Sequence, residues 1–351
     1  MGIINGDEFA PESTYLNTAS CGLLPRRAAE AVRILTAELV SGRPGGAGDF
    51  EVVDEARQRF ARLVGADASR VATGGSVAVH VGLIAGSLAP GSEVLFPEGE
   101  FGSVIDPFLL RGDFKLRYAP LAELAASVRP STALVAFSAV QSADGRTADL
   151  TALREAAAAH GARTLVDATQ ATGAYPVDAS WWDYTVTGAF KWLLCPRGAS
   201  FLTVSESAQE SLTPGNGGWL AAADSWNSTY GPLTELAPDA RRFDEPPAFL
   251  AYHAAVPALA LLEEIGVAAI HSHVMALADR YRAGLARLGH TPVPGGSSIV
   301  SVPGLADRHG ELWRAGVLTS ARAGHLRASF HLYNTEADVD RILDVLDGTG
   351  G

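Results

Sequence analysis

The chain has 351 residues, of which 47% are hydrophobic and 19% are charged, and its formal net charge is −12. This length allows a large core and two domains, and the acidic balance argues against a nucleic-acid or anionic-membrane partner. The N-terminus MGIINGDEFA lacks signal-peptide features, and no apolar run approaches the ~20 residues of a membrane span. Because only Cys21 and Cys195 are cysteines and no metal-ligand spacing is visible, we expect a cytoplasmic protein without a metal site.

Helical and strand-like patterns alternate from about residue 50 to 205. The stretch 50–65 has apolar residues at helical spacing and ends at Gly65, and 147–161 predicts a helix capped by Asp149 or Thr147. Short strands are expected within 92–101, 115–120, 131–145, 162–173, 181–192 and 198–204. Such alternation predicts an α/β fold with a mostly parallel central sheet flanked by helices.

The pattern changes after residue 244. A long apolar helix follows the break EPP, then strand-like sequence at 324–334 and a last amphipathic helix, TEADVDRILDVLDG. We therefore expect an N-terminal arm (1–22), a large domain (23–244) and a small α+β domain (245–351).

Lysine is rare in this chain. Only Lys115 and Lys191 are lysines among 27 basic residues. A guanidinium stays protonated, whereas a buried lysine amine can lose its proton and attack a carbonyl. The segment TGAFKWLLCPRG therefore makes Lys191 a candidate Schiff-base lysine, although an ordinary surface lysine would look the same.

Several polar residues lie at or just after strand ends, where ligands of open α/β sheets bind. Asp167 ends the apolar strand TLVD, and it either caps the next segment or pairs with the ring nitrogen of pyridoxal phosphate (PLP). Gln170 could donate to the ring oxygen or serve as a loop amide. Ser142 and Lys191 occupy equivalent positions after neighbouring strands.

Three further features suit an anionic ligand with a ring. The residues Gly75, Ser76 and Val77 open an apolar helix, where backbone N–H groups can bind a phosphate or simply be capped. Phe101 follows a strand end and either stacks on a ring or packs in the core. Arg327 could bind a substrate carboxylate or be an ordinary strand residue.

Taken together, these segments resemble the class V aminotransferase family of PLP enzymes, which has fold type I, and most closely its isopenicillin N epimerase-like and ergothioneine C–S lyase-like members. The similar segments are YLNTASCGLLP (15–25), TGGSVAVHVGL, EGEFGSV, VDATQATG, AFKWLLCPRG, NGGWLAAADSW (216–226) and LRASFHLYN. The resemblance extends through nearly the whole chain.

The resemblance implies roles for individual residues. Lys191 would hold PLP and act as the base at Cα, and Asp167 would keep the ring cationic. The further cofactor contacts would be Gly75, Ser76, Val77, Phe101, Ser142, Gln170, Thr187, Gly218 and Trp219. The substrate contacts would be Asn17, Gln141 and Arg327. The resemblance also implies a homodimer, in which Gly218 and Trp219 of one chain reach the site of the other.

The chain departs from the family pattern at several positions. Phe190 and Gly188 replace phosphate-binding residues of many relatives, which leaves Thr187 as a substitute, and Ser142 stands where asparagine is common. The region 315–327 lacks the cysteine that a cysteine desulfurase needs. We expect an enzyme that acts on an amino acid or an amino-acid-bearing intermediate by transamination or β-elimination.

Three alternatives stay open at this point. Epimerisation would use the same residues but would want a second base. A PLP-fold protein without catalysis would explain Phe190 and Gly188. A nucleotide-binding enzyme is disfavoured because the chain lacks the GxGxxG and P-loop patterns.

Overall fold

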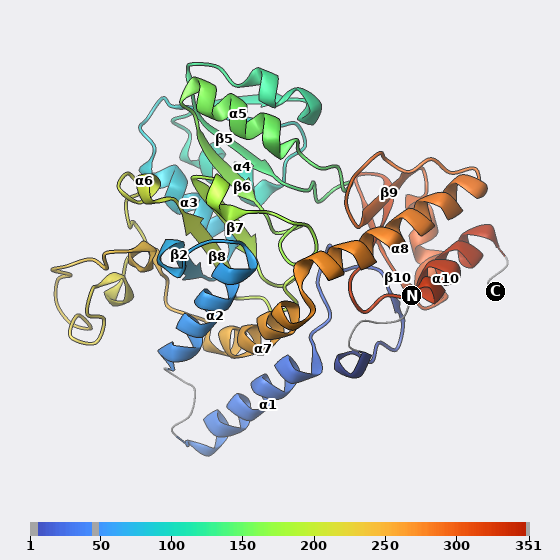
Figure 1. Ribbon diagram of the computed structural model, residues 1–351, viewed down its shortest axis with the longest axis horizontal. Coiled ribbons are helices and arrows are strands. Elements are labelled where there is room, and N and C mark those ends of the chain that lie inside the picture. Colours follow the sequence, from blue (N-terminus) through green and yellow to red (C-terminus); the bar gives the residue numbers. More distant parts are fainter. Residues whose placement is uncertain (1–5, 44–48, 349–351) are drawn as a thin grey trace.

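The computed structural model describes residues 6–43 and 49–348 (Figure 1). Its main sheet has the order β2-β8-β7-β6-β5-β3-β4, in which only β8 runs antiparallel to its neighbours. The strands are β2 (Val71–Gly74), β3 (Glu93–Pro97), β4 (Lys115–Ala119), β5 (Thr132–Ser138), β6 (Arg163–Asp167), β7 (Tyr184–Gly188) and β8 (Ser200–Val204). The predicted α/β fold with a mostly parallel sheet is confirmed.

Helices flank this sheet. They are α2 (Phe50–Leu63), α3 (Val77–Ser87), α4 (Gly102–Arg111), α5 (Leu150–His160) and α6 (Glu206–Gln209). Local capping explains the bounds of α5, because the Asp149 side chain accepts the N–H of Ala152 and Gly161, with φ 69°, ends the helix. Of the two predicted caps, Asp149 is therefore the one used.

The strand register brings several chain segments to one edge of the sheet. Ser138 lies opposite Asp167, and Ser200 lies opposite both Gly188 and Gly74. The parallel strands therefore end together, and the segments that follow Ser138, Asp167 and Gly188 meet the start of α3. This edge positions the candidate site.

The C-terminal part forms a second, smaller layer (Figure 1). Its sheet has the antiparallel order β11-β12-β9. Its elements are α8 (Val267–Arg287), β9 (Ile299–Pro303), α9 (His309–Arg314), β10 (Val317–Leu318), β11 (Ser320–Arg322), β12 (His325–Ser329) and α10 (Glu336–Asp347). The N-terminal arm joins this part, because β1 (Thr14–Tyr15) pairs with β10 and Asn17 bridges to Ser329.

Helix α7 (Phe249–Ile265) packs with the large sheet. It contacts α2 and α1 (Arg26–Ser41), and its buried side chains share an apolar cluster with those of α2 and β6. The domain boundary after residue 244 stays a prediction, and this packing favours a later boundary near Gly266. No single described helix is long and apolar enough to cross a membrane; α7 and α8 reach that only as a pair bent by 80°.

Candidate active site

Lys191 lies in the turn between β7 and β8, and backbone contacts fix this turn. Ala189 donates to Ala199 O (3.1 Å), and Gly22 of the N-terminal arm donates to Phe190 O (2.9 Å). A Cβ atom at Gly22 would lie 2.1 Å from the Lys191 carbonyl oxygen, so only glycine allows the arm to pack this closely. The backbone that carries Lys191 is therefore held from two sides.

The Lys191 side chain is buried, with 6% of its surface exposed. Its Nζ makes no hydrogen bond or ion pair with any residue in the described ranges 6–43 and 49–348. The nearest rings are those of Phe101 and Phe190, each with its centroid 5.5 Å from Nζ. A buried amine without a polar partner is costly, so it indicates a ligand.

Burial lowers the pKa of the Lys191 amine to about 8. The Asp167 carboxylate raises this pKa, whereas three positive charges lower it further. These charges belong to Arg327, Arg197 and Arg322. At pH 7 about a tenth of such an amine is neutral, whereas an ordinary lysine is almost wholly charged. The environment thus favours a nucleophilic amine.

Asp167 ends β6 in the same cavity. Its Oδ1 accepts the N–H of Thr169 (2.8 Å), and Thr169 Oγ1 accepts the N–H of Gly188 (2.9 Å). Burial raises the pKa of Asp167 to about 6, although the Thr169 hydrogen bonds lower it. No basic side chain of the described residues forms an ion pair with this carboxylate, so a cationic ligand atom would complete it.

Gln170 and Ser142 belong to one hydrogen-bond network. Gln170 Nε2 donates to Ser142 Oγ (2.8 Å) and to Ala19 O (3.0 Å), while its Oε1 accepts the indole N–H of Trp192 (2.9 Å). Both N–H groups of the Gln170 side-chain amide are therefore used by protein partners. Its predicted bond to a ring oxygen would need one of these partners to be exchanged.

Arg327 comes from β12 and enters the network from the other side. Its guanidinium donates to Ser20 Oγ (2.9 Å), Ser320 Oγ (3.1 Å) and both the carbonyl and hydroxyl oxygens of Ser142. Burial lowers the pKa of Arg327 to about 10. A buried guanidinium whose described partners are only neutral oxygens suits a ligand carboxylate.

The start of α3 lines another side of the site. Ser76 is the N-cap but makes no side-chain capping bond, so the first N–H groups of the helix are open to an anion. The N–H of Gly75 donates instead to Glu245 Oε2 (3.0 Å). A Cβ atom at Gly74 would lie 2.6 Å from His80 Cε1, so glycine is required for this close approach.

Lys191, Asp167, Gln170, Ser142 and the start of α3 line one cavity of about 320 Å³. Arg327 does not line it but donates hydrogen bonds to Ser142, which does. It is lined by Gly75, Ser76, Val77, Ala78, Phe101, Ser103, Ser138, Ser142, Asp167, Thr169, Gln170, Gly188, Phe190, Lys191, Arg197, Gly198 and Ala199. Phe101 is 47% exposed, which leaves a ring available for stacking. The guanidinium carbon of Arg197 lies 3.9 Å from the Phe190 ring centroid, so Phe190 supports a cation beside the start of α3.

Besides Arg327, five predicted site residues do not line this cavity. The Thr187 hydroxyl faces Thr172 (3.4 Å), and the Gln141 amide donates to Glu100 (2.9 Å). Asn17 lies on the N-terminal arm with its Oδ1 buried and without a partner among the described residues. Gly218 and Trp219 lie in a separate loop. The proposed roles of these five residues stay predictions.

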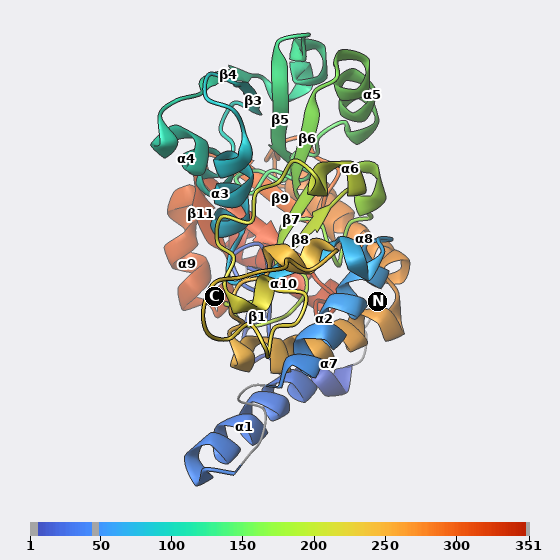
Figure 2. The ribbon, with the colours of Figure 1, turned by 90° about the vertical axis from the view of Figure 1, so that its left-hand side faces the viewer.

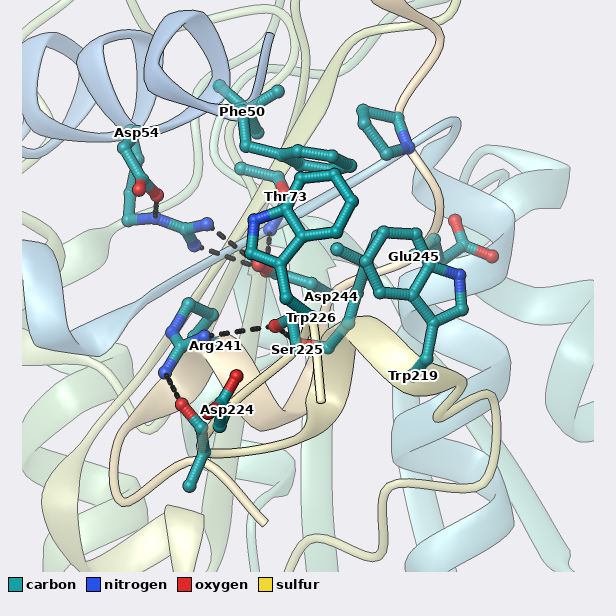
Figure 3. A pocket seen from close by; sticks show the side chains of 15 residues that line it. Phe50, Asp54, Thr73, Trp219, Asp224, Ser225, Trp226, Arg241, Asp244 and Glu245 are labelled. Carbon is teal, nitrogen blue, oxygen red and sulfur yellow. Dashed lines mark hydrogen bonds and ion pairs between the residues drawn. The ribbon is translucent and has the colours of Figure 1, made fainter. Parts of the chain in front are cut away.

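Trp219 lies in a second cavity, of about 470 Å³ (Figure 3). Its ring meets those of Phe50 and Trp226, with centroids 5.4 and 5.9 Å away. Arg57 and Asp244 form a buried ion pair there (2.7 Å), so the main charges of this cavity are satisfied internally.

Sequence reasoning missed Thr169 and Arg197, which line the first cavity. It also missed Ser20, Trp192 and Glu245, which hydrogen-bond to residues of the site without lining this cavity. The segment CPRG could have indicated Arg197, because it follows the lysine closely. Nothing in the local pattern around Glu245 indicates its contact with Gly75, which is 170 positions away.

The geometry fits PLP. Within the described part of the chain, the Lys191 amine has no polar partner and suits an aldehyde, and the Asp167 carboxylate has no ion-pair partner and suits a ring nitrogen. The open start of α3 suits a phosphate. The exposed ring of Phe101 can cover one face. No group of three or more potential metal ligands occurs among the described residues.

The family model for class V aminotransferases matches residues 46–303, and the chain belongs to this family. It is 31% identical to the isopenicillin N epimerase of Streptomyces clavuligerus, across 97% of this chain and 96% of that protein. It is 28% identical to the uncharacterised aminotransferase YcbU of Bacillus subtilis (strain 168), across 84% and 83% of the chains.

Solved structures show the same fold. The cystine C–S lyase C-DES, in complex with its product cysteine persulfide, superposes with a TM-score of 0.85 at 22% identity. The alignment covers 95% of this chain and 97% of that one. The chain is thus a PLP-dependent, class V aminotransferase-like enzyme with the fold of this family.

Proposed function

We propose that Lys191 forms the Schiff base with PLP and acts as the base at Cα of an amino acid, giving transamination or β-elimination. One observation carries this proposal: an amine that is buried, and has no polar partner among the residues the structure describes, lies in the same cavity as a carboxylate without an ion-pair partner there and an open helix start. Lys115, the other lysine, is exposed at the edge of the sheet.

Each residue contributes through its position. When bound, PLP supplies an aldehyde for the amino group and a ring that accepts the electron pair left at Cα. Arg327 binds the α-carboxylate, which orients the Cα–H bond toward Lys191. The neutral Lys191 amine takes the Cα proton and can return it to a neighbouring carbon. The charge on Asp167 favours a cationic ring nitrogen, and Arg197 with the start of α3 binds the phosphate.

The reaction type follows from the number of bases. Only Asp167, Lys191 and Arg197 are ionisable among the residues that line the cavity, and Asp167 and Arg197 already have roles toward the cofactor. A single base favours transamination or β-elimination over a two-base epimerisation. Epimerisation is the second candidate, because the chain is similar to an isopenicillin N epimerase along nearly its full length.

Product analysis separates these reactions. The protein loaded with PLP should be incubated in ²H₂O with single L-amino acids, with and without a keto-acid acceptor. We expect an α-keto acid that keeps the side chain (transamination), or pyruvate with a released β-substituent (β-elimination). Recovery of the D-amino acid with deuterium at Cα, without keto acid, would overturn the proposed reaction in favour of epimerisation.

We also propose a cytoplasmic homodimer. Helix α1 projects from the body (Figures 1 and 2), and its Val40 is exposed. Trp226 and Tyr230, which follow Gly218 and Trp219 along the chain, are also exposed. These apolar surfaces support burial against a second copy. Both cysteines are free thiols, which suits a reducing compartment. Light scattering should give twice the monomer mass of 36.6 kDa; a monomeric mass would contradict the dimer.

A further inference from the structure

A smaller cavity of about 220 Å³ adjoins the Lys191 cavity and shares Phe101 and Ser142 with it. One of its walls is the hairpin formed by β11 and β12, which contributes Arg322 and Ala323. Nothing in the proposed chemistry uses this space. It is open to the part of a substrate that extends beyond Cα.

Strand register places Arg322 on the same face of the hairpin as Arg327. Ser320 lies opposite Arg327, and Arg322 is two residues further along β11. Directly opposed residues and residues two apart share one face of a β-ribbon. The two arginines are therefore diagonal neighbours, with Cα atoms roughly 7–8 Å apart. Both side chains leave the hairpin toward the cavities.

Arg322 has no acidic partner among the described residues. Its guanidinium donates only to the carbonyl oxygen of Ala321 (2.9 Å). The small cavity also contains the Glu100 carboxylate, which is bound by other residues and not by Arg322. This carboxylate accepts hydrogen bonds from the N–H and hydroxyl of Ser138, from the Gln141 amide and from the N–H of Phe101.

The cofactor phosphate does not account for Arg322. The start of α3 lines the Lys191 cavity and not the small one, and Arg197 already supplies a cation in the Lys191 cavity. The positive charge of Arg322 nevertheless lowers the pKa of Arg327, after the larger effect of burial. An anion bound between these two arginines would relieve their repulsion.

We propose that Arg322 binds a second anionic group of the substrate, so that this enzyme takes dicarboxylic amino acids of the aspartate and glutamate class. The α-carboxylate binds Arg327, and the distal carboxylate occupies the small cavity against Arg322. A short chain of methylene groups spans diagonal neighbours on a β-ribbon, which matches this class. The inference rests on the proposed function, because it needs the amino group to be placed near Lys191.

The test compares each acid with its neutral amide. The purified holoenzyme is titrated with L-glutamate, L-glutamine, L-aspartate and L-asparagine while the visible absorption band of the cofactor is followed, and kcat/KM is measured for each. The variants are Arg322→Met, Arg322→Lys and, as a control, Arg287→Met, which removes an exposed arginine at the end of α8. We expect the wild type to bind the better acid at least about tenfold more tightly than its amide.

The variants give the decisive comparison. Arg322→Met should remove most of that preference while leaving the affinity for the amide unchanged, Arg322→Lys should keep part of it, and Arg287→Met should keep all of it. Equal binding of acid and amide by the wild type would overturn the inference, as would an equal loss for both in Arg322→Met. The cofactor band on Lys191 would then still support the proposed function. Absence of that band would overturn both.

Discussion

The cavity that contains Trp219 and the cavity that contains Lys191 both lie beside the β2–α3 connection, but they differ in how their charges are satisfied. The larger one contains Arg57, whose guanidinium donates to both carboxylate oxygens of Asp244 and to the Val71 carbonyl oxygen. Asp244 also accepts the N–H of Thr73. The smaller one contains Lys191, which has no such partner among the described residues. Size therefore does not identify the active site here; unpaired ionisable groups do.

The difference has a physical meaning. A paired buried charge has already regained most of the interactions that it lost on leaving water, so it gains little from a ligand. A buried amine without a hydrogen-bond partner, and a buried carboxylate without an ion-pair partner, among the described residues gain charge compensation when a ligand binds. We therefore expect substitutions in the cavity that contains Arg57 to change stability and those in the cavity that contains Lys191 to change chemistry.

The largest effect should follow Lys191→Ala. We expect the turnover to fall by roughly a thousandfold or more, because the base at Cα and the covalent link are both lost. The midpoint of thermal unfolding should stay near that of the wild type, because no protein hydrogen bond is removed. The matched control is Lys115→Ala, measured in the same turnover assay. A comparable loss of turnover in Lys115→Ala would contradict the assignment.

Arg57→Met, in contrast to Lys191→Ala, should lower stability and leave cofactor binding intact. It leaves the Asp244 carboxylate buried without its cation, so we expect the free energy of unfolding in urea to fall by about 3–5 kcal/mol. The folded variant should still form the cofactor band. Arg62→Met, which removes an exposed partner of Glu263, should cost much less. The idea of an internally satisfied cavity fails if the two variants lose the same stability.

The unusual pKa of Lys191 predicts a pH dependence. Because this pKa is lowered to about 8, the neutral amine is scarce below pH 8 and dominates above it. The initial rate at which the cofactor-free protein forms its absorption band with PLP should rise by roughly twentyfold between pH 6.5 and 8.5. A rate that keeps rising toward pH 10 would indicate an ordinary lysine.

The smallest predicted effect concerns the boundary between the cavities. Glu245 lines the larger cavity but places its carboxylate on the N–H of Gly75 at the start of α3. It therefore competes with an incoming phosphate. Glu245→Gln should tighten the binding of PLP by about two- to fivefold in a fluorescence titration, and Glu210→Gln, on the exposed surface, should not. Weaker binding in Glu245→Gln would mean that the carboxylate helps to hold the helix start instead.

Much of the fold followed from local patterns. Short apolar runs located the strands, and capping residues such as Asp149 located α5, because both signals lie within a few residues of the element. The antiparallel direction of β8 could not be predicted from the sequence, because the hydrophobic pattern of a buried strand does not indicate its direction. The packing of α7 on the large sheet depends on contacts that are distant in sequence.

The site shows the same limit. Lys191, Asp167 and Phe101 lie just beyond strand ends, and the parallel sheet brings them into one cavity with the start of α3. Thr187 was expected there, but its hydroxyl meets Thr172 instead. Glu245 was not expected, because a turn far along the chain places it beside Gly75. Spacing predicts what a strand end presents, whereas long-range packing decides which partner it meets.

The proposed role of Lys191 is tested most directly by identifying the lysine that carries the cofactor. The protein incubated with PLP is reduced with borohydride, digested, and mapped by mass spectrometry for the pyridoxyl group. We predict loss of the visible band and a label on Lys191 alone, with Lys115 unmodified in the same sample. A label on Lys115, or no label on Lys191 under saturating PLP, would contradict the central claim.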